Sequence, residues 1–506
     1  MPLLTARDRR AARAIAHLTT ANPFSERRVE LEREALKKQF VGPAVAWSFD
    51  PLAKEVRPNV AALDRRAEDL LAKMKAALAT GARFVDDEAR LFDDLALHLA
   101  FGRYEDAFFR VLTEGAPVDF FDAFETTLRD DRAAPGVAPY ERAEVTHLFS
   151  LFFQLRRAFH FTYRRILGAS APAARLREEV WQSIFTHDLD RYRAVLYDRM
   201  QDVPTLVVGP SGTGKELVAN AIGRSRFIPY SREKGRFEAD YDQIFLALNL
   251  AALSPTLIES ELFGHRRGAF TGAIADREGY LERPAPYTTV FLDEIGEVDP
   301  AVQVKLLRVL QTRNFLRLGD GAERTFGGKI VAATHRDLAE RIADGAFRED
   351  FFYRLCADRI ETPTLAEQLA DDPDELARVV LAVAYRVAGP QIAESLADET
   401  VATIGRDLGL AYAWPGNMRE LEQCVRSVLV RRSYRPSVAS PDDGLFADAL
   451  RGTLTAEELL VRYCTLVYVQ TGSYEAAARR LLMDRRTVKR KVDAEWAERL
   501  REEIHP

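Results

Sequence analysis

The chain carries a glycine-rich string with the composition of a phosphate-binding loop. It reads Gly209-Pro210-Ser211-Gly212-Thr213-Gly214-Lys215 and stands between an apolar run and a helical pattern that opens at Glu216. Glycines let backbone N–H groups turn inward around phosphate oxygens, and a helix N-terminus adds a favourable dipole. The Lys215 ammonium would neutralise the β- and γ-phosphates. The string predicts a nucleotide site formed by Gly209, Ser211, Gly212, Thr213, Gly214, Lys215 and Glu216.

Two adjacent carboxylates, Asp293 and Glu294, follow the apolar run at residues 289–292. At such a place one carboxylate can hold Mg²⁺, directly or through water, and its neighbour can activate the attacking water. We assign Mg²⁺ to Asp293 and the general base to Glu294. Two acids after a strand can also be a helix N-cap and first turn, but their spacing from the phosphate loop favours the catalytic interpretation.

A second glycine-flanked string lies between the phosphate loop and these carboxylates. It is the hexapeptide Gly268-Ala269-Phe270-Thr271-Gly272-Ala273, or GAFTGA. Two glycines around an Ala-Phe-Thr core make a loop that can change backbone conformation while presenting one exposed aromatic ring. The structural alternative is a turn beside a buried Phe270.

The segment that must position these residues alternates apolar strands with amphipathic helices. Residues 205–208, 289–292 and 330–333 are nearly continuous apolar runs, which are typical of parallel strands buried on both faces. We therefore expect an α/β fold, a three-layer domain over residues 186–432. Its α/β part should reach about residue 362, and a helical lid should occupy residues 363–432.

The flanking segments have different patterns. Residues 1–185 predict a mainly α-helical N-terminal regulatory domain, and an aromatic stripe along residues 144–167 favours a helix–helix core over the wall of a ligand pocket. Residues 433–452 contain Pro, Ser, Asp and Gly without periodicity and predict a linker. Residues 453–506 predict a small helical unit.

The C-terminal unit has helix-turn-helix spacing. A helix over residues 475–482, a turn at Met483-Asp484 and a second helix over residues 485–493 would place the second helix in a DNA major groove. Val488 and Val492 should face the core of this unit. A charged terminal helix can be only a solvated face, but the turn pattern favours DNA contacts. The candidate DNA-binding residues are Arg485, Arg486, Thr487, Lys489 and Arg490.

Composition limits the classes of function. The 506 residues leave room for about three domains. A net charge of −6 argues against a chain that coats nucleic acid, so any DNA contact must come from a local basic element. Cys356, Cys424 and Cys464 lack the spacing of a disulfide framework or zinc site. No apolar run approaches a membrane span, and we expect a protein of the cytosol without a membrane partner.

The hexapeptide and the motifs around it resemble a known family. GAFTGA is similar to the surface loop by which sigma-54-dependent transcriptional activators, bacterial enhancer-binding proteins of the AAA+ class, grip their sigma factor. A generic phosphate loop has Ser or Thr where Glu216 stands, whereas these activators commonly have Glu. The C-terminal unit resembles the Fis-type helix-turn-helix domain that closes many of them.

The resemblance implies roles for residues around the nucleotide. Asn249, in LNLAAL, corresponds to the asparagine that holds the catalytic glutamate until the nucleotide state changes. Thr334 and His335 occupy the sensor I position, where the family usually has Asn after Thr. A histidine there can still donate a hydrogen bond to water or to the γ-phosphate.

Three arginines also match the family. Arg348 and Arg354, in FREDFFYRL, correspond to the arginines that a neighbouring subunit inserts towards the γ-phosphate, and Arg419, in WPGNMREL, corresponds to the sensor II arginine of the lid. The chain departs from the family in two places. It has more residues between positions 223 and 248, and it has Pro-Thr-Leu-Ala-Glu-Gln at positions 363–368 instead of Pro-Leu-Arg-Glu-Arg.

The resemblance implies a transcription activator that hydrolyses ATP with Mg²⁺. It would assemble as a homo-oligomeric ring, a hexamer, and bind an upstream activator site on double-stranded DNA. ATP turnover would drive the hexapeptide loop against the sigma-54 RNA polymerase holoenzyme, remodelling the closed complex towards the open one. One alternative is an AAA+ remodelling ATPase with a different protein client, which the hexapeptide disfavours. Another is a DNA-binding repressor with a vestigial nucleotide site, which Lys215, Asp293 and Glu294 disfavour.

Overall fold

The chain divides into two compact units, Met1–Arg432 and Ser433–Pro506. The computed structural model describes residues 2–42, 58–283, 286–372, 374–409, 412–436, 454–494 and 496–497. The predicted linker at residues 433–452 lies outside the described residues from position 437 onwards. No helix in the described ranges is long and apolar enough to cross a membrane.

The N-terminal part is helical, as expected. Its helices are α1 (Ala6–Thr20), α2 (Glu26–Leu36), α3 (Pro58–Ala79), α4 (Glu88–Glu114), α5 (Phe121–Arg132), α6 (Arg142–Arg165) and α7 (Ala171–Phe185). Thr5 caps α1 by accepting a hydrogen bond from the backbone of Asp8. The buried Glu88 carboxylate accepts from the backbone N–H of Leu3 at 3.0 Å and from Arg9 at 2.7 Å. These two bonds fix the first residues of the chain on α4.

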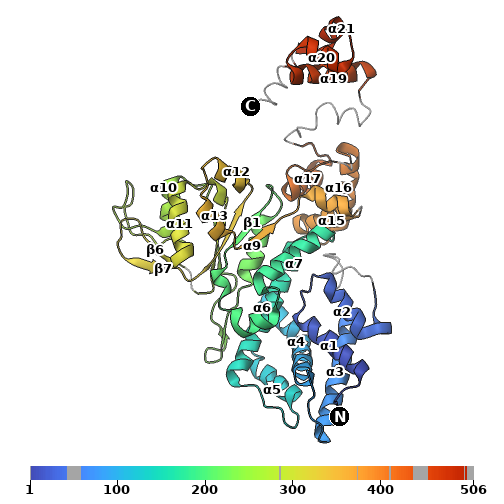
Figure 1. Ribbon diagram of the computed structural model, residues 1–506, viewed down its shortest axis with the longest axis vertical. Coiled ribbons are helices and arrows are strands. Elements are labelled where there is room, and N and C mark those ends of the chain that lie inside the picture. The colour runs from blue at the N-terminus through green and yellow to red at the C-terminus, as the bar shows by residue number, and fades with distance from the viewer. Residues whose placement is uncertain are drawn as a thin grey trace. The chain divides into compact units, whose positions relative to one another are not determined.

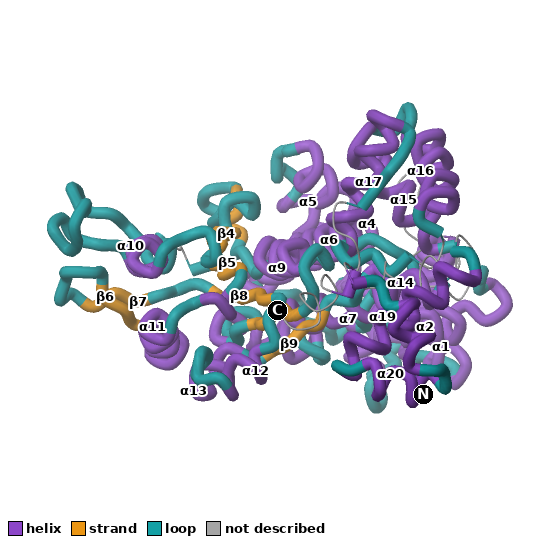
Figure 2. The backbone as a smooth tube through the Cα atoms, turned by 90° about the horizontal axis from the view of Figure 1, so that it is seen from above, coloured by secondary structure: helices purple, strands orange, loops and turns teal. Residues whose placement is uncertain are grey.

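Five parallel strands form the central sheet, in the order β4-β5-β8-β1-β9. The strands are β1 (Thr205–Val208), β4 (Phe245–Asn249), β5 (Thr289–Asp293), β8 (Lys329–Thr334) and β9 (Asp358–Glu361). The predicted runs at 205–208, 289–292 and 330–333 are all strands, and β5 and β8 extend slightly further. The register pairs Asn249 with Asp293 at one end of β4 and β5. Figure 2 shows β4, β5 and β8 in this order, with β9 beyond them.

Helices cover both faces of this sheet, so the three-layer α/β prediction is confirmed. Val207, Phe291 and Val331 pack on one face against α7 and α9 (Lys215–Arg224). Leu206, Leu292 and Ala332 pack on the other face, against α10 (Pro255–Phe263), α11 (Pro300–Thr312) and α13 (Glu349–Leu355). Neighbouring residues of one strand point to opposite faces, which accounts for the continuous apolar runs.

Helix α7 belongs to the core of the sheet although it precedes the predicted ATPase segment. Its residues Val180, Ile184 and Phe185 are buried in the same cluster as β1 and α9. Figure 1 shows α6 and α7 between the N-terminal helices and the sheet. The predicted boundary between residues 185 and 186 therefore falls at the end of a core helix, and it stays a prediction.

Shorter elements complete the first unit. They are the hairpins β2 (Tyr230–Ser231) with β3 (Arg236–Phe237) and β6 (Asn314–Leu316) with β7 (Glu323–Thr325), and the single turns η1 (Lys37–Gln39), α8 (Leu189–Arg191), η2 (Tyr192–Leu196), η3 (Met200–Asp202), η4 (Ile295–Glu297) and α12 (Leu338–Ala343). The lid consists of α14 (Leu365–Asp371), α15 (Glu375–Ala388), α16 (Ala393–Asp407) and α17 (Asn417–Arg431). The β2–β3 hairpin lies between positions 223 and 248, in the segment where the chain has more residues than the family it resembles.

The second unit contains α19 (Ala456–Thr471), α20 (Tyr474–Leu481) and α21 (Arg485–Lys491). Ser473 caps α20 and Asp484 caps α21 through side-chain oxygens. Val488 is fully buried against Ala477 and Val467, and Val492 packs at the edge of this cluster. Helix α21 ends at Lys491 rather than at residue 493, because Val492 has extended backbone angles.

Lys329 gives this fold a pH dependence that can be measured. Its ammonium is buried at the start of β8 and donates to the backbone oxygens of Met200 and Val203. Burial lowers the pKa of Lys329 to about 7. Between this pH and the pKa of an unfolded lysine, near 10.4, the unfolded state binds more protons. Stability therefore rises with pH across that window, by up to about 1.4 kcal/mol per pH unit.

The Lys329→Met variant should lose this contribution. Between pH 7 and pH 9, we expect the urea midpoint of the wild type to rise relative to that of the variant. Unfolding followed by tryptophan fluorescence at both pH values measures it. Parallel pH dependence in the two proteins would show that Lys329 does not titrate in this range.

Candidate active site

The phosphate loop connects β1 to α9, and its backbone requires glycine. Gly209 and Gly212 have φ angles of +143° and +80°. A Cβ atom at Gly209 would lie 2.2 Å from the Thr362 hydroxyl, and one at Gly212 would lie 2.2 Å from the carbonyl oxygen of Gly416. Both the left-handed backbone and the close neighbours therefore exclude a side chain at these positions.

Lys215 is the first residue of α9, and its ammonium folds back onto the loop. It donates to the carbonyl oxygens of Gly209 at 2.8 Å and Pro210 at 3.0 Å. Burial lowers the pKa of Lys215, while the nearby carboxylates of Glu294 and Asp293 oppose that shift. The Lys215 ammonium thus stands at the N-terminus of α9, where the helix dipole also favours an anion.

A cleft of about 400 Å³ opens beside the loop. The ends of β4 and β5 line it through Asn249, Asp293 and Glu294, and the lid lines it through α15 and α17. The phosphate-loop residues Ser211, Gly212, Gly214, Lys215 and Glu216 line the same cleft. The structure therefore brings together most of the residues predicted to bind nucleotide, with both predicted catalytic carboxylates.

Asp293 and Glu294 have different surroundings. Asp293 is the last residue of β5 and accepts a hydrogen bond from the Asn249 amide at 3.2 Å. Burial and the adjacent Glu294 carboxylate raise the pKa of Asp293. Glu294 has left-handed backbone angles, φ 57° and ψ 46°, which turn the chain sharply after the strand. Two neighbouring carboxylates are thereby directed to separate partners.

The Glu294 carboxylate is bound by His335. The imidazole Nδ1 lies 2.7 Å from Glu294 Oε2, and the backbone N–H of His335 approaches the same oxygen at 3.4 Å. In this structure Asn249 contacts Asp293 instead of Glu294. The contact that the resemblance implied for asparagine is thus made here by His335, the residue predicted to stand at the sensor I position. Thr334, buried at the end of β8, accepts from the backbone N–H of Arg336 at 3.1 Å.

We predict that His335 positions Glu294. A hydrogen bond to a charged group contributes about 1.5–3 kcal/mol, so His335→Ala should lower the ATPase turnover number about tenfold or more. The ATP concentration at half-maximal rate should change little, because His335 does not line the described cleft. His335→Asn retains a donor and should recover part of the rate. Steady-state ATPase assays separate the two parameters, and an unchanged or faster turnover in the alanine variant would contradict a supporting role.

The lid is hydrogen-bonded to the phosphate loop by three consecutive residues of α17. The Asn417 side-chain amide donates to the carbonyl oxygen of Ser211 at 3.0 Å. The backbone N–H of Met418 donates to the carbonyl oxygen of Gly212 at 3.1 Å. Arg419 donates to the Ser211 hydroxyl at 3.2 Å. Sequence reasoning singled out Arg419 but missed Asn417. The sequence signal that could have indicated Asn417 is its position directly after Pro-Gly, at the start of a helical pattern.

Arg348 is the N-cap residue of α13, and Arg354 lies in the last turn of that helix. Arg348 forms a two-pronged ion pair with Asp350, at 3.0 and 2.8 Å, and Arg354 is exposed. Neither lines the cleft of its own chain. Their predicted action on a neighbouring subunit stays a prediction.

The hexapeptide forms a turn on a stem that joins α10 to β5. Gly268 and Gly272 have φ angles of +84° and +104°, and the N–H of Gly268 donates to the carbonyl oxygen of Ala273 at 2.8 Å. The Phe270 ring lies against the His265 ring, with centroids 5.0 Å apart. Phe270 is half-buried and stands outside the buried clusters of the described residues, Ala269 is half-buried, and Thr271 is exposed.

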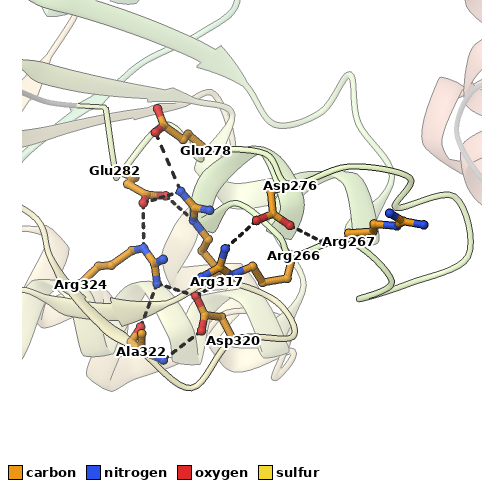
Figure 3. A network of polar contacts seen from close by, with 9 residues as sticks. All are labelled: Arg266, Arg267, Asp276, Glu278, Glu282, Arg317, Asp320, Ala322 and Arg324. Atoms are coloured by element: carbon orange, nitrogen blue, oxygen red, sulfur yellow. Dashed lines mark hydrogen bonds and ion pairs between the residues drawn. The ribbon is translucent and has the colours of Figure 1, made fainter.

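A network of ion pairs ties the stem of this loop to the β6–β7 hairpin (Figure 3). Arg266 binds Asp276 at 2.6 Å across the stem and Asp320 of the hairpin turn at 3.2 Å. Arg324 bridges Asp320 at 2.9 Å and Glu282 at 2.7 Å. The network extends to Arg317, which pairs with Glu282 at 2.6 Å. Movement of the hairpin is therefore coupled to the stem by several charged contacts.

The second unit presents the predicted DNA-binding residues on α21. Arg485, Arg486, Lys489 and Arg490 are exposed, and Thr487 is half-buried. Arg485 pairs with Glu475 of α20 at 3.1 Å. By helical spacing, Arg486 and Arg490 lie on the side of α21 opposite the buried Val488, and Lys489 lies between the two sides.

Comparison with known proteins places the central segment in a family. Residues 185–361 match the family model described as Sigma-54 interaction domain. The chain is similar to the Nif-specific regulatory protein of Azotobacter vinelandii, with 46% identity over 220 residues, covering 44% of this chain and 38% of that protein. It is also similar to the DNA-binding transcriptional regulator NtrC of Escherichia coli strain K12, with 44% identity over 241 residues, covering 48% and 47%.

The chain spans about half the length of the curated relatives it matches. Among solved structures, it is similar to NtrX from Brucella abortus in complex with ATP, with 22% identity, a TM-score of 0.39 and coverage of 79% of this chain and 86% of that one. The match of residues 185–361 to the Sigma-54 interaction domain model, together with these curated relatives, confirms the predicted resemblance to sigma-54-dependent regulators.

Proposed function

We propose that the protein is an ATP-hydrolysing transcription activator that remodels sigma-54 RNA polymerase holoenzyme at promoters. One observation carries the proposal. A single domain combines the Lys215–Asp293–Glu294 cleft with an exposed hexapeptide loop on a separate stem. Chemistry and contact with a protein client would thereby be divided between two sites of one α/β domain.

The residues of the cleft fit ATP with Mg²⁺. A positive-φ glycine loop at a helix N-terminus supplies backbone donors, Lys215 supplies a cation, and Asp293 supplies a carboxylate for the metal. Bound Mg²⁺ would neutralise phosphate charge. Glu294 would take a proton from the attacking water, and His335 would hold the Glu294 carboxylate in place. Arg419 and Asn417 connect the lid to the loop, so lid position responds to what the loop binds.

The hexapeptide loop would contact sigma-54. Its glycines permit two backbone arrangements, and its stem is bound to the β6–β7 hairpin through Arg266 and Asp320. Assembly into a ring, a hexamer, would bring Arg348 and Arg354 of one subunit to the cleft of the next. The α20–α21 unit would hold the ring at an upstream activator site on double-stranded DNA.

Open-complex formation on a sigma-54 promoter tests the proposal directly. The full chain, with sigma-54 holoenzyme and ATP, should convert closed complexes to open ones, detected by permanganate reactivity of unpaired thymines. ATP hydrolysis without promoter opening would favour an AAA+ ATPase with a different client. DNA binding without hydrolysis would favour a repressor with a vestigial nucleotide site.

DNA binding should depend on the exposed charges of α21. Replacing Arg486, Lys489 and Arg490 with Ala should weaken binding to an upstream site at least tenfold and leave the ATPase rate nearly unchanged. The slope of log affinity against log salt should become shallower by about 0.9 for each lost phosphate contact. Electrophoretic mobility shifts at several salt concentrations measure both effects.

A matched control removes the same charge elsewhere. Arg7, Arg10 and Lys38 are exposed residues of the N-terminal part, and their replacement by Ala should leave DNA affinity intact. Equal loss of affinity in the two triple variants would mean that net charge, rather than α21, determines binding.

A further inference from the structure

A second cavity lies within the N-terminal helices, apart from the nucleotide cleft. It measures about 210 Å³ and is lined by residues of α1, α2, α3, α4, α6 and α7. Four aromatic side chains contribute to its walls, namely Phe101, Phe152, Phe159 and Trp181. Its surface is mainly apolar, which is characteristic of a pocket for a small organic molecule.

The charged side chains at this cavity oppose one another. Arg28 pairs with Glu32, His98 lies 3.1 Å from Asp64, and Arg156 lies 3.8 Å from Glu105. Each of these acidic side chains therefore has a basic side chain beside it. Among the described lining residues both arginines are paired with carboxylates, so an anionic ligand would lose its hydration here without meeting an unpaired arginine. The charge distribution thus favours an uncharged ligand.

The volume and the aromatic walls of the cavity limit the class of ligand further. An apolar cavity of about 150 Å³ accepts benzene, so 210 Å³ has room for a somewhat larger ring system. Aromatic side chains bind flat rings by stacking and edge contacts. We propose that this cavity binds an uncharged aromatic molecule of one or two rings, and that helix α6 relays its presence to the ATPase domain.

Helix α6 is suited to this relay because two of its sides have different partners. Phe152, Leu155 and Arg156 line the cavity. Gln154 donates to the carbonyl oxygen of Ser225 at 2.9 Å, and the buried Arg157 donates to those of Arg224 at 2.8 Å and Arg226 at 2.6 Å. Arg224 is the last residue of α9, whose first residue is Lys215. A shift of α6 would therefore reach the helix that carries the phosphate-loop lysine.

The extra segment of the chain adds a second connection. The Phe153 ring stacks on the ring of Phe237 in the β2–β3 hairpin, with centroids 4.2 Å apart. The Phe149 ring contacts that of Tyr230, with centroids 4.8 Å apart. The N–H of Tyr230 donates to the Ser150 hydroxyl at 2.9 Å. These residues alternate along α6 with those of the cavity, at the spacing of helical turns. The hairpin thus binds the side of α6 that the cavity leaves free.

Indole, an uncharged two-ring probe, tests the binding step on the full chain. Isothermal titration should show one indole per chain. Gly102 lines the cavity within α4, where an added Cβ would make only ordinary contact, 3.5 Å from Asp64. Gly102→Leu should fill the space and weaken indole binding at least tenfold, while Gly102→Ala stays within threefold of the wild type. Val60→Phe provides a second filling variant if Gly102→Leu does not fold.

Three results would overturn the assignment. They are the absence of indole binding by the wild type, unchanged binding by a folded filling variant, and tighter binding of indole-3-carboxylate, which carries a negative charge, than of indole. None of these measurements requires ATP hydrolysis, so their failure is distinct from failure of the proposed function.

Hydrogen exchange tests the relay. Indole should change the exchange rates of backbone amides at residues 226–241 in the wild type. Phe237→Ala removes the stacking on α6 and should preserve indole binding while abolishing that change. Tyr241→Phe, which loses only a hydrogen bond to the carbonyl oxygen of Leu112, serves as the milder variant. Identical exchange with and without bound indole in the wild type would refute the relay.

Discussion

Glu294→Gln should bind ATP with nearly wild-type affinity and hydrolyse it at least about a hundredfold more slowly, the range for loss of a general base. The glutamine keeps the size of the side chain and can still bond to His335, which lies 2.7 Å from the carboxylate. It cannot accept a proton from water. Lys215 and the phosphate loop remain intact, so binding should survive. Fluorescent nucleotide titration and single-turnover hydrolysis measure the two quantities separately.

Glu297→Gln is the matched control for this variant. Glu297 lies in the short turn after β5 and forms an ion pair with Arg336 at 2.6 Å, but it does not line the nucleotide cleft. Its replacement should leave hydrolysis within a few-fold of the wild type. Rapid hydrolysis by Glu294→Gln, or an equal loss in both variants, would show that another residue activates the water.

Features encoded by neighbouring residues could be predicted from the sequence. The run at 205–208, the glycines after it and the carboxylates after β5 are local patterns, and the sheet places them at one edge because parallel strands share a direction. Strand β9 was harder to predict. It is short, and charged residues stand at both of its ends. Asp358 is accommodated there because the hydroxyls of Ser183 and Thr205 donate to it.

Contacts between distant residues could not be predicted in the same way. His335 and Glu294 are 41 positions apart, and their bond depends on the left-handed turn at Glu294 and on side-chain rotamers. The extra segment was visible as additional length, but its attachment to α6 depends on the packing of rings such as Phe153 and Phe237. The aromatic stripe of α6 supplies both this packing and part of the cavity wall. Hydrophobic periodicity in the sequence favoured the packing role and gave no indication of the cavity.

The Thr271→Ala variant should hydrolyse ATP at the wild-type rate and fail to open a sigma-54 promoter. Thr271 is exposed at the tip of the hexapeptide turn and does not line the nucleotide cleft, so the change should alter neither nucleotide chemistry nor stability. Loss of one interface side chain in a small contact loop can remove most of the binding energy. We expect open-complex formation to fall at least tenfold, together with capture of sigma-54 in the presence of a transition-state nucleotide analogue.

The control and the alternative outcome separate a contact role from a structural one. Thr126 is an exposed threonine of α5, and Thr126→Ala should behave as the wild type in both assays. If the hexapeptide merely completed a core around Phe270, Thr271→Ala would lower the thermal midpoint and the ATPase rate together. The half-buried ring against His265, outside the buried clusters, argues against that result. Normal hydrolysis with normal promoter opening would instead remove Thr271 from the sigma-54 contact and require another surface to transmit the work of ATP turnover.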